Sequence, residues 1–406
     1  MSNHIRLFMQ NIILLFLCIS IIPCYAANRG DTPSAESLYS SYHSTVSLGT
    51  ANMSLAEKNY VQLRDILPLY QNAVMHPWPT IPDTSKKLKT GIQNPAVVLL
   101  RERLKATRDL PEYYNRADNL FDKSLAQAVK AFQQRNGLKA DGVVGKMTLQ
   151  ELNVPPAVRV KQIIINIQRW ASLAHRLNGR FIIVNVPDYE LYAYDNNEKI
   201  LSIKAIVGKP DTETPELQSQ ISRLVFNPYW NVPTKIAQNE IVKKVRENPG
   251  YLDTMRLKIL TSEESNAAEI DQDQVDWHAA QVNGFPYRFR QEPGLDNSLG
   301  IVKFEFQNSH DVYLHDTPAK ELFNQDERAL SHGCVRLENP LALVDFLMDG
   351  SPDWNEEHMQ EILSADKTKY VKAYRPTSIL ITYITAWVDD HGAINFRNDI
   401  YGKDID

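Results

Sequence analysis

The sequence has little cysteine, with three residues among 406, at Cys18, Cys24 and Cys334. The first two lie in an apolar N-terminal stretch that, as argued below, has the features of a cleaved signal. If it is removed, Cys334 is the single remaining cysteine, and an intramolecular disulfide is excluded. In an exported protein an unpaired cysteine indicates intermolecular pairing or a reactive thiol. An inert cysteine packed as a small hydrophobic residue is the alternative.

Long hydrophobic runs are also missing. The longest, "IILLFLCISII" at residues 12–22, is shorter than the roughly 20 residues that a membrane span needs. His4 and Arg6 precede it and Ala26 follows closely, which is typical of a secretory signal peptide. We predict a signal peptide at residues 1–26 and an exported, periplasmic protein, with an uncleaved signal anchor as the alternative.

The chain lacks an excess of positive charge. It has 44 Lys and Arg residues and 49 Asp and Glu residues, which gives a formal net charge of -5. A protein without a basic surface is a poor partner for nucleic acid. The length and a hydrophobic content of 43% are sufficient for two or three domains with their own cores.

Helical patterns fill much of the first half after a polar segment, which we interpret as an N-terminal arm or scaffold at residues 27–89. Asn94 and Pro95 form a helix start. A second helix carries apolar residues at helical spacing up to Phe132, and Gly137 stands where a left-handed cap would end it. A turn at Asp141 leads to a short third helix. The pattern predicts a three-helix module at residues 90–153.

This stretch, "LAQAVKAFQQRNGLKADGVVGKMTLQELN", resembles the peptidoglycan-binding module found at the ends of many wall-active enzymes. The resemblance covers residues 94–153 and depends on the Phe-Gln pair, the Asp-Gly turn and the Gly and Thr that follow in order. It implies association with the cell wall. A generic helical bundle is the alternative.

In the second half of the chain, apolar and polar residues alternate with a period of two, as in β-strands. The runs "RFIIVNV", "YELYAYD" and "KILSIKAIVG", and later "IVKFEF", "DVYLHD" and "SILITYITAWV", predict a mainly antiparallel sheet. Residues 228–299 interrupt them with helical character and many aromatic residues, including Trp230, and an insertion of this size favours a functional lid over padding. We expect an α+β multidomain protein: the helical module and a β-sandwich domain at residues 156–388, with a hairpin and tail at 389–406.

The segment "SHGCVR", residues 331–336, contains the isolated cysteine. A free thiol is mostly protonated at neutral pH, so a reactive one needs a nearby base or cation. His332 is close in sequence but points parallel to Cys334 in an extended segment. His315 shares a strand face with Tyr313 and can lie beside Cys334 on a neighbouring strand. Gly333 allows close backbone approach to an oxyanion.

"VYLHDTP" followed by "LSHGCVRL" is similar to the signature of the L,D-transpeptidase catalytic domain, also called the YkuD domain. The resemblance extends from about residue 180 to the C-terminus and includes "IVGKPDTETP". Together with the insertion and the preceding module, the chain resembles the larger periplasmic L,D-transpeptidases with a capping subdomain.

The resemblance implies roles for individual residues. Cys334 matches the nucleophile and His315 the residue that accepts and donates its proton, while His332 and Gly333 match residues around the nucleophile and its oxyanion hole. We expect substrate contacts from Arg336, whose guanidinium can bind a carboxylate, and also from the aromatic residues Tyr313 and Trp230.

No cofactor or metal is implied. Two histidines and a thiolate raise a zinc site as the alternative, but the His-x-Cys spacing matches no common zinc pattern. His310 could join such a cluster, although a surface loop is the expected setting for it.

The implied substrates are peptidoglycan stem peptides, one as donor and one as acceptor. Cys334 would form a thioester with the diamino acid of a tetrapeptide stem and release D-Ala, after which a second stem would complete a 3→3 cross-link. An L,D-carboxypeptidase, an enzyme that attaches protein to the wall, and a non-catalytic wall-binding protein remain alternatives. The sequence specifies no partner protein in wall synthesis.

Overall fold

The computed structural model describes residues 53–406 apart from residues 85, 265, 366 and 406. The predicted signal peptide and the first half of the predicted N-terminal arm lie outside the described residues. Within these described residues, no helix combines the length and the apolar character that crossing a membrane requires.

Within the remaining part of the arm, residues 53–89, helix α3, Leu55–Met75, packs against helix α7, Pro156–Leu173. Ser54 and Glu57 close the start of α3 with a capping box. The Asn59 side chain accepts a hydrogen bond of 2.8 Å from the amide of Val388, and so joins α3 to the C-terminal hairpin. This part of the arm is therefore packed against the remainder of the chain.

The three predicted helices are α4, Ala96–Ala106, α5, Lys123–Arg135, and α6, Lys146–Leu152. Asn94 bonds the amide of Ala96 at 2.9 Å, and Gly137 after α5 has a φ of +67°. Gln133 on α5 bonds the amide of Gly142 and the Thr148 side chain, which fixes the turn between α5 and α6. The helices share one hydrophobic core built from residues such as Val97, Leu100, Leu125, Val129 and Phe132.

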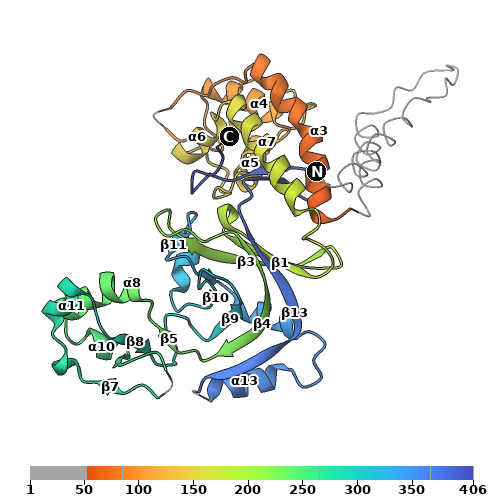
Figure 1. Cartoon of the computed structure of the whole chain (residues 1–406). Coiled ribbons are helices and arrows are strands. Elements are labelled where there is room, and N and C mark those ends of the chain that lie inside the picture. Colours follow the sequence, from red (N-terminus) through yellow and green to blue (C-terminus); the bar gives the residue numbers. More distant parts are fainter. Residues whose placement is uncertain (1–52, 85, 265, 366, 406) are drawn as a thin grey trace, which may run out of the picture. The chain divides into compact units, whose positions relative to one another are not determined.

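One sheet of nine strands forms the centre of the second half (Figure 1). Its order is β11-β3-β12-β10-β9-β4-β13-β1-β2, and β2 also pairs with β3, so the sheet closes on itself. The strands are β1, Phe181–Asn185; β2, Glu190–Asp195; β3, Glu198–Gly208; β4, Leu217–Phe226; β9, Val302–Phe306; β10, Leu314–His315; β11, Ala329–Ser331; β12, Val335–Leu337; and β13, Lys369–Thr382.

The α+β class is confirmed, and most pairings are antiparallel. The exceptions are β1 with β13, β10 with β12, and β11 with β3, which are parallel. The two layers expected of a sandwich are opposite sides of the closed sheet. Parallel β10 and β12 carry parts of the two halves of the sequence signature.

The sheet encloses a hydrophobic core that includes Leu224, Phe304, Leu314, Val335 and Leu337. Helix α12, Pro340–Met348, and helix α13, Glu356–Ser364, complete it. Short 3-10 turns occupy three connections: η1, Val186–Asp188; η3, Gln272–Gln274; and η4, Lys320–Asn324. The C-terminal hairpin pairs β14, Ala386–Val388, with β15, Ile394–Phe396, so it begins three residues before the predicted boundary.

The insertion at residues 228–299 has a hydrophobic core of its own, in which the rings of Phe285 and Phe289 stack with centroids 4.3 Å apart. It is only partly helical, because it also holds a four-stranded sheet of order β5-β8-β6-β7. Its elements are β5, Trp230–Asn231; α8, Thr234–Ile236; η2, Ala237–Ile241; α9, Val242–Glu247; α10, Tyr251–Thr254; β6, Leu257–Leu260; β7, Glu269–Ile270; α11, Trp277–Asn283; and β8, Arg288–Gln291.

Candidate active site

The register of β10 and β12 brings the two halves of the sequence signature together. Leu314 pairs with Val335 and His315 pairs with Arg336. Leu314 and Val335 are fully buried in the core, so their neighbours along each strand face the opposite side of the sheet. The residues that share this outer face are Tyr313 and His315 on one strand and Cys334 and Arg336 on the other.

The imidazole of His315 is neutral and can accept a proton. Its ring is buried, and Nδ1 bonds the backbone carbonyl of Asp316. That bond keeps the proton on Nδ1 and leaves the Nε2 lone pair free to accept another. Burial, followed by the charge of Arg336, lowers the pKa of His315 to about 3. The imidazole is therefore neutral at physiological pH.

Asp316 orients His315 through its backbone alone. Its carboxylate faces elsewhere, accepting from the amide of Ile301 at 2.9 Å and from Lys320 Nζ at 2.5 Å. The Asp316 side chain thus fixes the loop that carries the histidine.

Cys334 is half-buried, and its Sγ lies 3.9 Å from the carbonyl oxygen of Asp311. Burial raises the pKa of the thiol, although hydrogen bonds from Tyr313 and the positive charges of Lys303 and Arg336 oppose that rise. The resting group is a protonated thiol, and a base must take its proton before the sulfur can attack.

Tyr313 lies against the nucleophile. Burial and the neighbouring Cys334 raise the pKa of its phenol well above the usual value, so the hydroxyl keeps its proton and can donate to the sulfur. Its ring centroid is 5.6 Å from that of His315, and its side chain also interacts with Trp230. Tyr313 therefore connects His315, Cys334 and the insertion.

A network of short polar contacts holds the loop before Cys334. Gly333 has a φ of +114°, and its amide donates to Ser331 Oγ at 3.1 Å. The Ser331 hydroxyl donates to the Cys334 carbonyl at 2.6 Å, and the buried Thr214 hydroxyl donates to the Gly333 carbonyl at 2.8 Å. Sequence reasoning assigned no role to Ser331 or Thr214, although both belong to the quoted motifs.

This network bears on the oxyanion hole. The Gly333 amide, expected to stabilise an oxyanion, is bound to Ser331 and so is not free. The amide of Cys334 makes no hydrogen bond among the described residues. It is a backbone donor of this loop that remains available to a developing oxyanion.

His332 contacts the insertion instead of the nucleophile. Its Nε2 lies 2.7 Å from Oε1 of Glu240, and both side chains are about one third exposed. Glu240 belongs to η2, a π-helical turn, and such turns are frequent at functional sites. With Trp230 beside Tyr313, the insertion reaches the candidate site at two points.

Arg336 is a cation without an acidic partner. Among the described residues its guanidinium forms no ion pair, and its buried Nε has no hydrogen-bond partner. Burial lowers the pKa of Arg336, while Cys334 opposes that change. A guanidinium left unpaired beside the nucleophile can bind a carboxylate.

A zinc site has no set of ligands here. In the part of the chain that the structure describes, no three or more His, Cys, Asp or Glu side chains gather in a way that could hold a metal ion. His310 is exposed on a loop.

Comparisons with known proteins support both of the resemblances that the motifs indicated. A model of the L,D-transpeptidase catalytic domain, the YkuD family, matches residues 179–353. A model of a peptidoglycan binding domain matches residues 93–152. Both resemblances predicted from the motifs are therefore confirmed.

A Haemophilus influenzae protein named provisionally as an L,D-transpeptidase is 34% identical over 244 residues, which cover 60% of this chain and 48% of that protein. The chain thus spans about half the length of this relative. The N-acetylmuramoyl-L-alanine amidase of Mycobacterium tuberculosis is 42% identical over 72 residues, 16% of this chain and 18% of the amidase.

Solved structures of L,D-transpeptidases are also similar. The one from Xylanimonas cellulosilytica is 17% identical with a TM-score of 0.23, covering 74% of this chain and all of that one. The one from Stackebrandtia nassauensis is 14% identical with a TM-score of 0.26, covering 75% of this chain and 96% of that one.

Proposed function

Because the chain carries an L,D-transpeptidase catalytic domain of the YkuD family and a peptidoglycan binding domain, we propose that it is an exported cysteine transpeptidase forming 3→3 cross-links between stem peptides. The observation that carries this proposal is the neutral, buried His315, which shares an outer sheet face with Cys334 on the adjacent strand. A neutral imidazole next to a protonated thiol is the arrangement that general-base activation requires.

In the first half-reaction, His315 Nε2 takes the proton of Cys334 as Sγ attacks the carbonyl of the donor's diamino acid at its L-centre. A carbon–sulfur bond forms and the carbon–nitrogen bond to the terminal D-Ala breaks. The proton on His315 passes to the departing amine. Arg336 holds the carboxylate of that D-Ala, and the Cys334 amide and the Tyr313 hydroxyl donate to the oxyanion and the sulfur.

In the second half-reaction, the side-chain amine of an acceptor stem attacks the thioester. His315 takes a proton from the attacking amine and returns it to the sulfur. The new amide joins the two stems, and Cys334 is restored as a thiol.

Water competes with the acceptor amine for the thioester. The insertion is suited to limit that competition, because Trp230 and Glu240 bring it against Tyr313 and His332. Closure over the nucleophile would exclude water and hold the acceptor. The insertion therefore acts as a lid that favours transfer over hydrolysis.

The peptidoglycan binding domain would keep the enzyme at its polymeric substrate, in the periplasm if the N-terminal segment directs export. An L,D-carboxypeptidase and an enzyme attaching protein to the wall use the same acyl-enzyme, and differ only in the acceptor. A non-catalytic wall-binding protein would form no acyl-enzyme.

The test is an incubation of the purified protein with a tetrapeptide stem, with and without an acceptor stem, followed by mass spectrometry of protein and products. We expect an adduct on Cys334 equal to the stem less D-Ala, and a cross-linked dimer when acceptor is present. Cys334→Ser is the control. Absence of any adduct would contradict the proposal, and hydrolysis alone would favour the carboxypeptidase.

A further inference from the structure

A row of polar side chains runs from Cys334 across the outer face of the sheet. The register of β10 with β9 places Tyr313 opposite Glu305. Glu305 pairs with Arg223 on β4, and Arg223 pairs with Lys372 on β13. Residues paired across neighbouring strands point to the same face. The nucleophile therefore lies at one end of a row that crosses four further strands.

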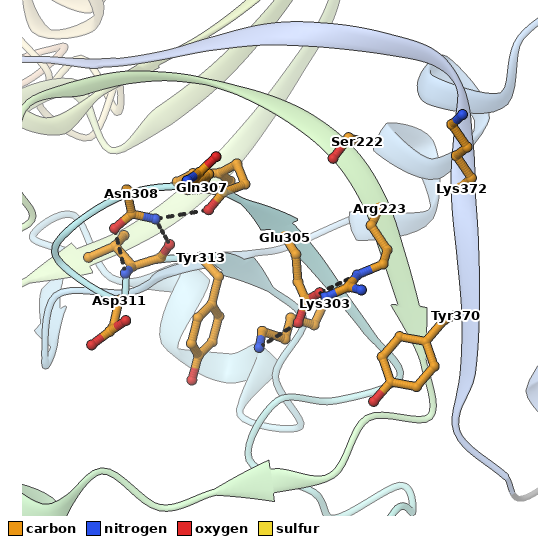
Figure 2. A pocket seen from close by; sticks show the side chains of 12 residues that line it. Ser222, Arg223, Lys303, Glu305, Gln307, Asn308, Asp311, Tyr313, Tyr370 and Lys372 are labelled. Carbon is orange, nitrogen blue, oxygen red and sulfur yellow. Dashed lines mark hydrogen bonds and ion pairs between the residues drawn. The ribbon is translucent and has the colours of Figure 1, made fainter.

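The row lies in a cavity of about 810 Å³, which we call the lateral groove. Figure 2 shows Tyr313 at one side of it, Lys303 and Glu305 in its middle, and Tyr370 and Lys372 on β13 at the other side. Asp311, whose carbonyl contacts the Cys334 sulfur, lines the end beside Tyr313. The lateral groove therefore ends at two residues, Asp311 and Tyr313, that contact Cys334.

Inside the groove, the carboxylate of Glu305 lies between two cations. Lys303 Nζ lies 4.2 Å from the Tyr313 ring centroid and 3.0 Å from Glu305 Oε1. Arg223 Nε lies 2.6 Å from Glu305 Oε2. Although burial raises the pKa of Glu305, Lys303 and Arg223 lower it below the usual value, so this carboxylate stays ionised.

Lys372 lies at the far end of the row, and its positive charge has no acidic partner among the described residues. Its side chain is exposed, and in the described part of the chain its ammonium group forms no ion pair or hydrogen bond. Tyr370 lies beside it on the same face, with its ring centroid 5.3 Å from the Arg223 guanidinium carbon. A cation without a partner next to an exposed aromatic ring suits a ligand that carries a carboxylate.

The length of the row fits a short peptide. Neighbouring strands are about 4.8 Å apart, so four steps from Cys334 to Lys372 span roughly 19 Å. An extended chain covers about 3.3–3.6 Å per residue, so about five or six residues would fill the whole row. An acceptor whose side-chain amine lies between Tyr313 and Glu305 needs to span two to three strand spacings, roughly 12 Å, to bring its terminal carboxylate to Lys372.

We propose that the lateral groove binds the acceptor stem peptide, with its nucleophilic amine between Tyr313 and Glu305 and its terminal carboxylate on Lys372. This inference rests on the proposed function, in which Arg336 already receives the carboxylate of the donor. Nearby cations disfavour a protonated amine, so Lys303 keeps the amine nucleophilic while Glu305 accepts a hydrogen bond from its N–H.

The test compares Lys372→Glu with Lys369→Glu in the full chain. Lys369 is an exposed lysine of the same strand, three positions away and on the opposite face. Acylation of Cys334 by donor alone and the acceptor concentration that gives half-maximal cross-linking are measured separately. We expect Lys372→Glu to raise that concentration roughly tenfold, as loss of a charge-assisted contact implies. Acylation by the donor and the behaviour of Lys369→Glu should stay at wild-type values.

A second acceptor, in which the terminal carboxylate is replaced by an amide, separates the outcomes further. With this acceptor, wild type and Lys372→Glu should reach half-maximal cross-linking at the same acceptor concentration. Equal requirements for the ordinary acceptor would overturn the inference, and slower acylation by donor alone in Lys372→Glu would instead make the groove a donor site. Absence of acylation in the wild-type protein would reject the proposed function itself.

Discussion

Glu240 in the insertion holds His332 in the loop of the candidate nucleophile, with Oε1 and Nε2 2.7 Å apart. The two side chains come from different parts of the fold, so their contact couples the position of the insertion to the segment that ends at Cys334. The insertion is therefore placed to respond to, or to control, what happens at the sulfur.

This contact predicts the effect of Glu240→Gln. The neutral amide keeps the shape but weakens the hold on His332, so the lid opens more often and water reaches the thioester. We expect the ratio of hydrolysis to cross-linking to rise about three- to tenfold, since loss of one partly exposed polar contact costs about 1 kcal/mol. Product analysis with a fixed acceptor concentration measures the ratio. Glu247→Gln, at an exposed position of the same insertion, is the control. Equal ratios of hydrolysis to cross-linking for the two variants would count against a lid.

The unpaired Arg336 predicts a second result. Arg336→Gln removes the guanidinium that we propose receives the donor's terminal carboxylate, and also one of the charges that lower the pKa of Cys334. The KM for the donor stem should rise at least tenfold. Alkylation of Cys334 by iodoacetamide should become slower at pH 7. A donor with an amidated C-terminus should lose the difference in KM between the variant and the wild type, and a persistent difference would assign Arg336 to another contact.

The loop network predicts a loss of stability in Thr214→Val. The Thr214 hydroxyl donates to the Gly333 carbonyl and accepts from the amide of Gly208, both in buried surroundings. Its removal leaves two buried backbone groups unpaired and should lower the free energy of unfolding by about 1–3 kcal/mol. Thr214→Ser keeps the hydroxyl and should restore most of it. Urea unfolding of the three proteins measures the difference, and similar midpoints would contradict a clamping role.

The pKa of His315 predicts a dependence of stability on pH. Its folded pKa of about 3 lies below the unfolded value near 6.5, so the unfolded chain binds a proton first as the pH falls. The neutral histidine thus favours folding above pH 6.5, and that contribution is lost on acidification towards pH 3. Between pH 7 and 5 the loss is on the order of 2 kcal/mol.

The variant that isolates this effect is His315→Gln, which does not titrate. Its free energy of unfolding should fall less than that of the wild type between pH 7 and 5. Equal slopes would show that the imidazole is not held neutral by burial.

Much of the chemical centre could be predicted from the sequence. The alternation of "DVYLHD" places Tyr313 and His315 on one face, and the glycine before Cys334 indicates a tight turn next to the nucleophile. These features are local, so strand periodicity and the conformational preference of one residue are sufficient to see them.

Other parts depend on contacts between segments distant in the chain. The lateral groove exists only because β9, β4 and β13 pair in a fixed register, which neither composition nor periodicity specifies. The contact of Glu240 with His332 likewise depends on how the folded insertion lies against the loop before Cys334. The sheet inside the insertion was missed, since its strands are two to four residues long and too short for a reliable alternation pattern.

The central claim is that His315 removes the proton from Cys334 during attack on the donor. Single-turnover acylation of Cys334 by a tetrapeptide stem at pH 7, followed by intact-protein mass spectrometry in wild type and His315→Ala, tests it most directly. The account predicts a rate constant at least about a hundredfold lower in the variant, with the fold unchanged by circular dichroism. Acylation of His315→Ala at the wild-type rate would contradict it.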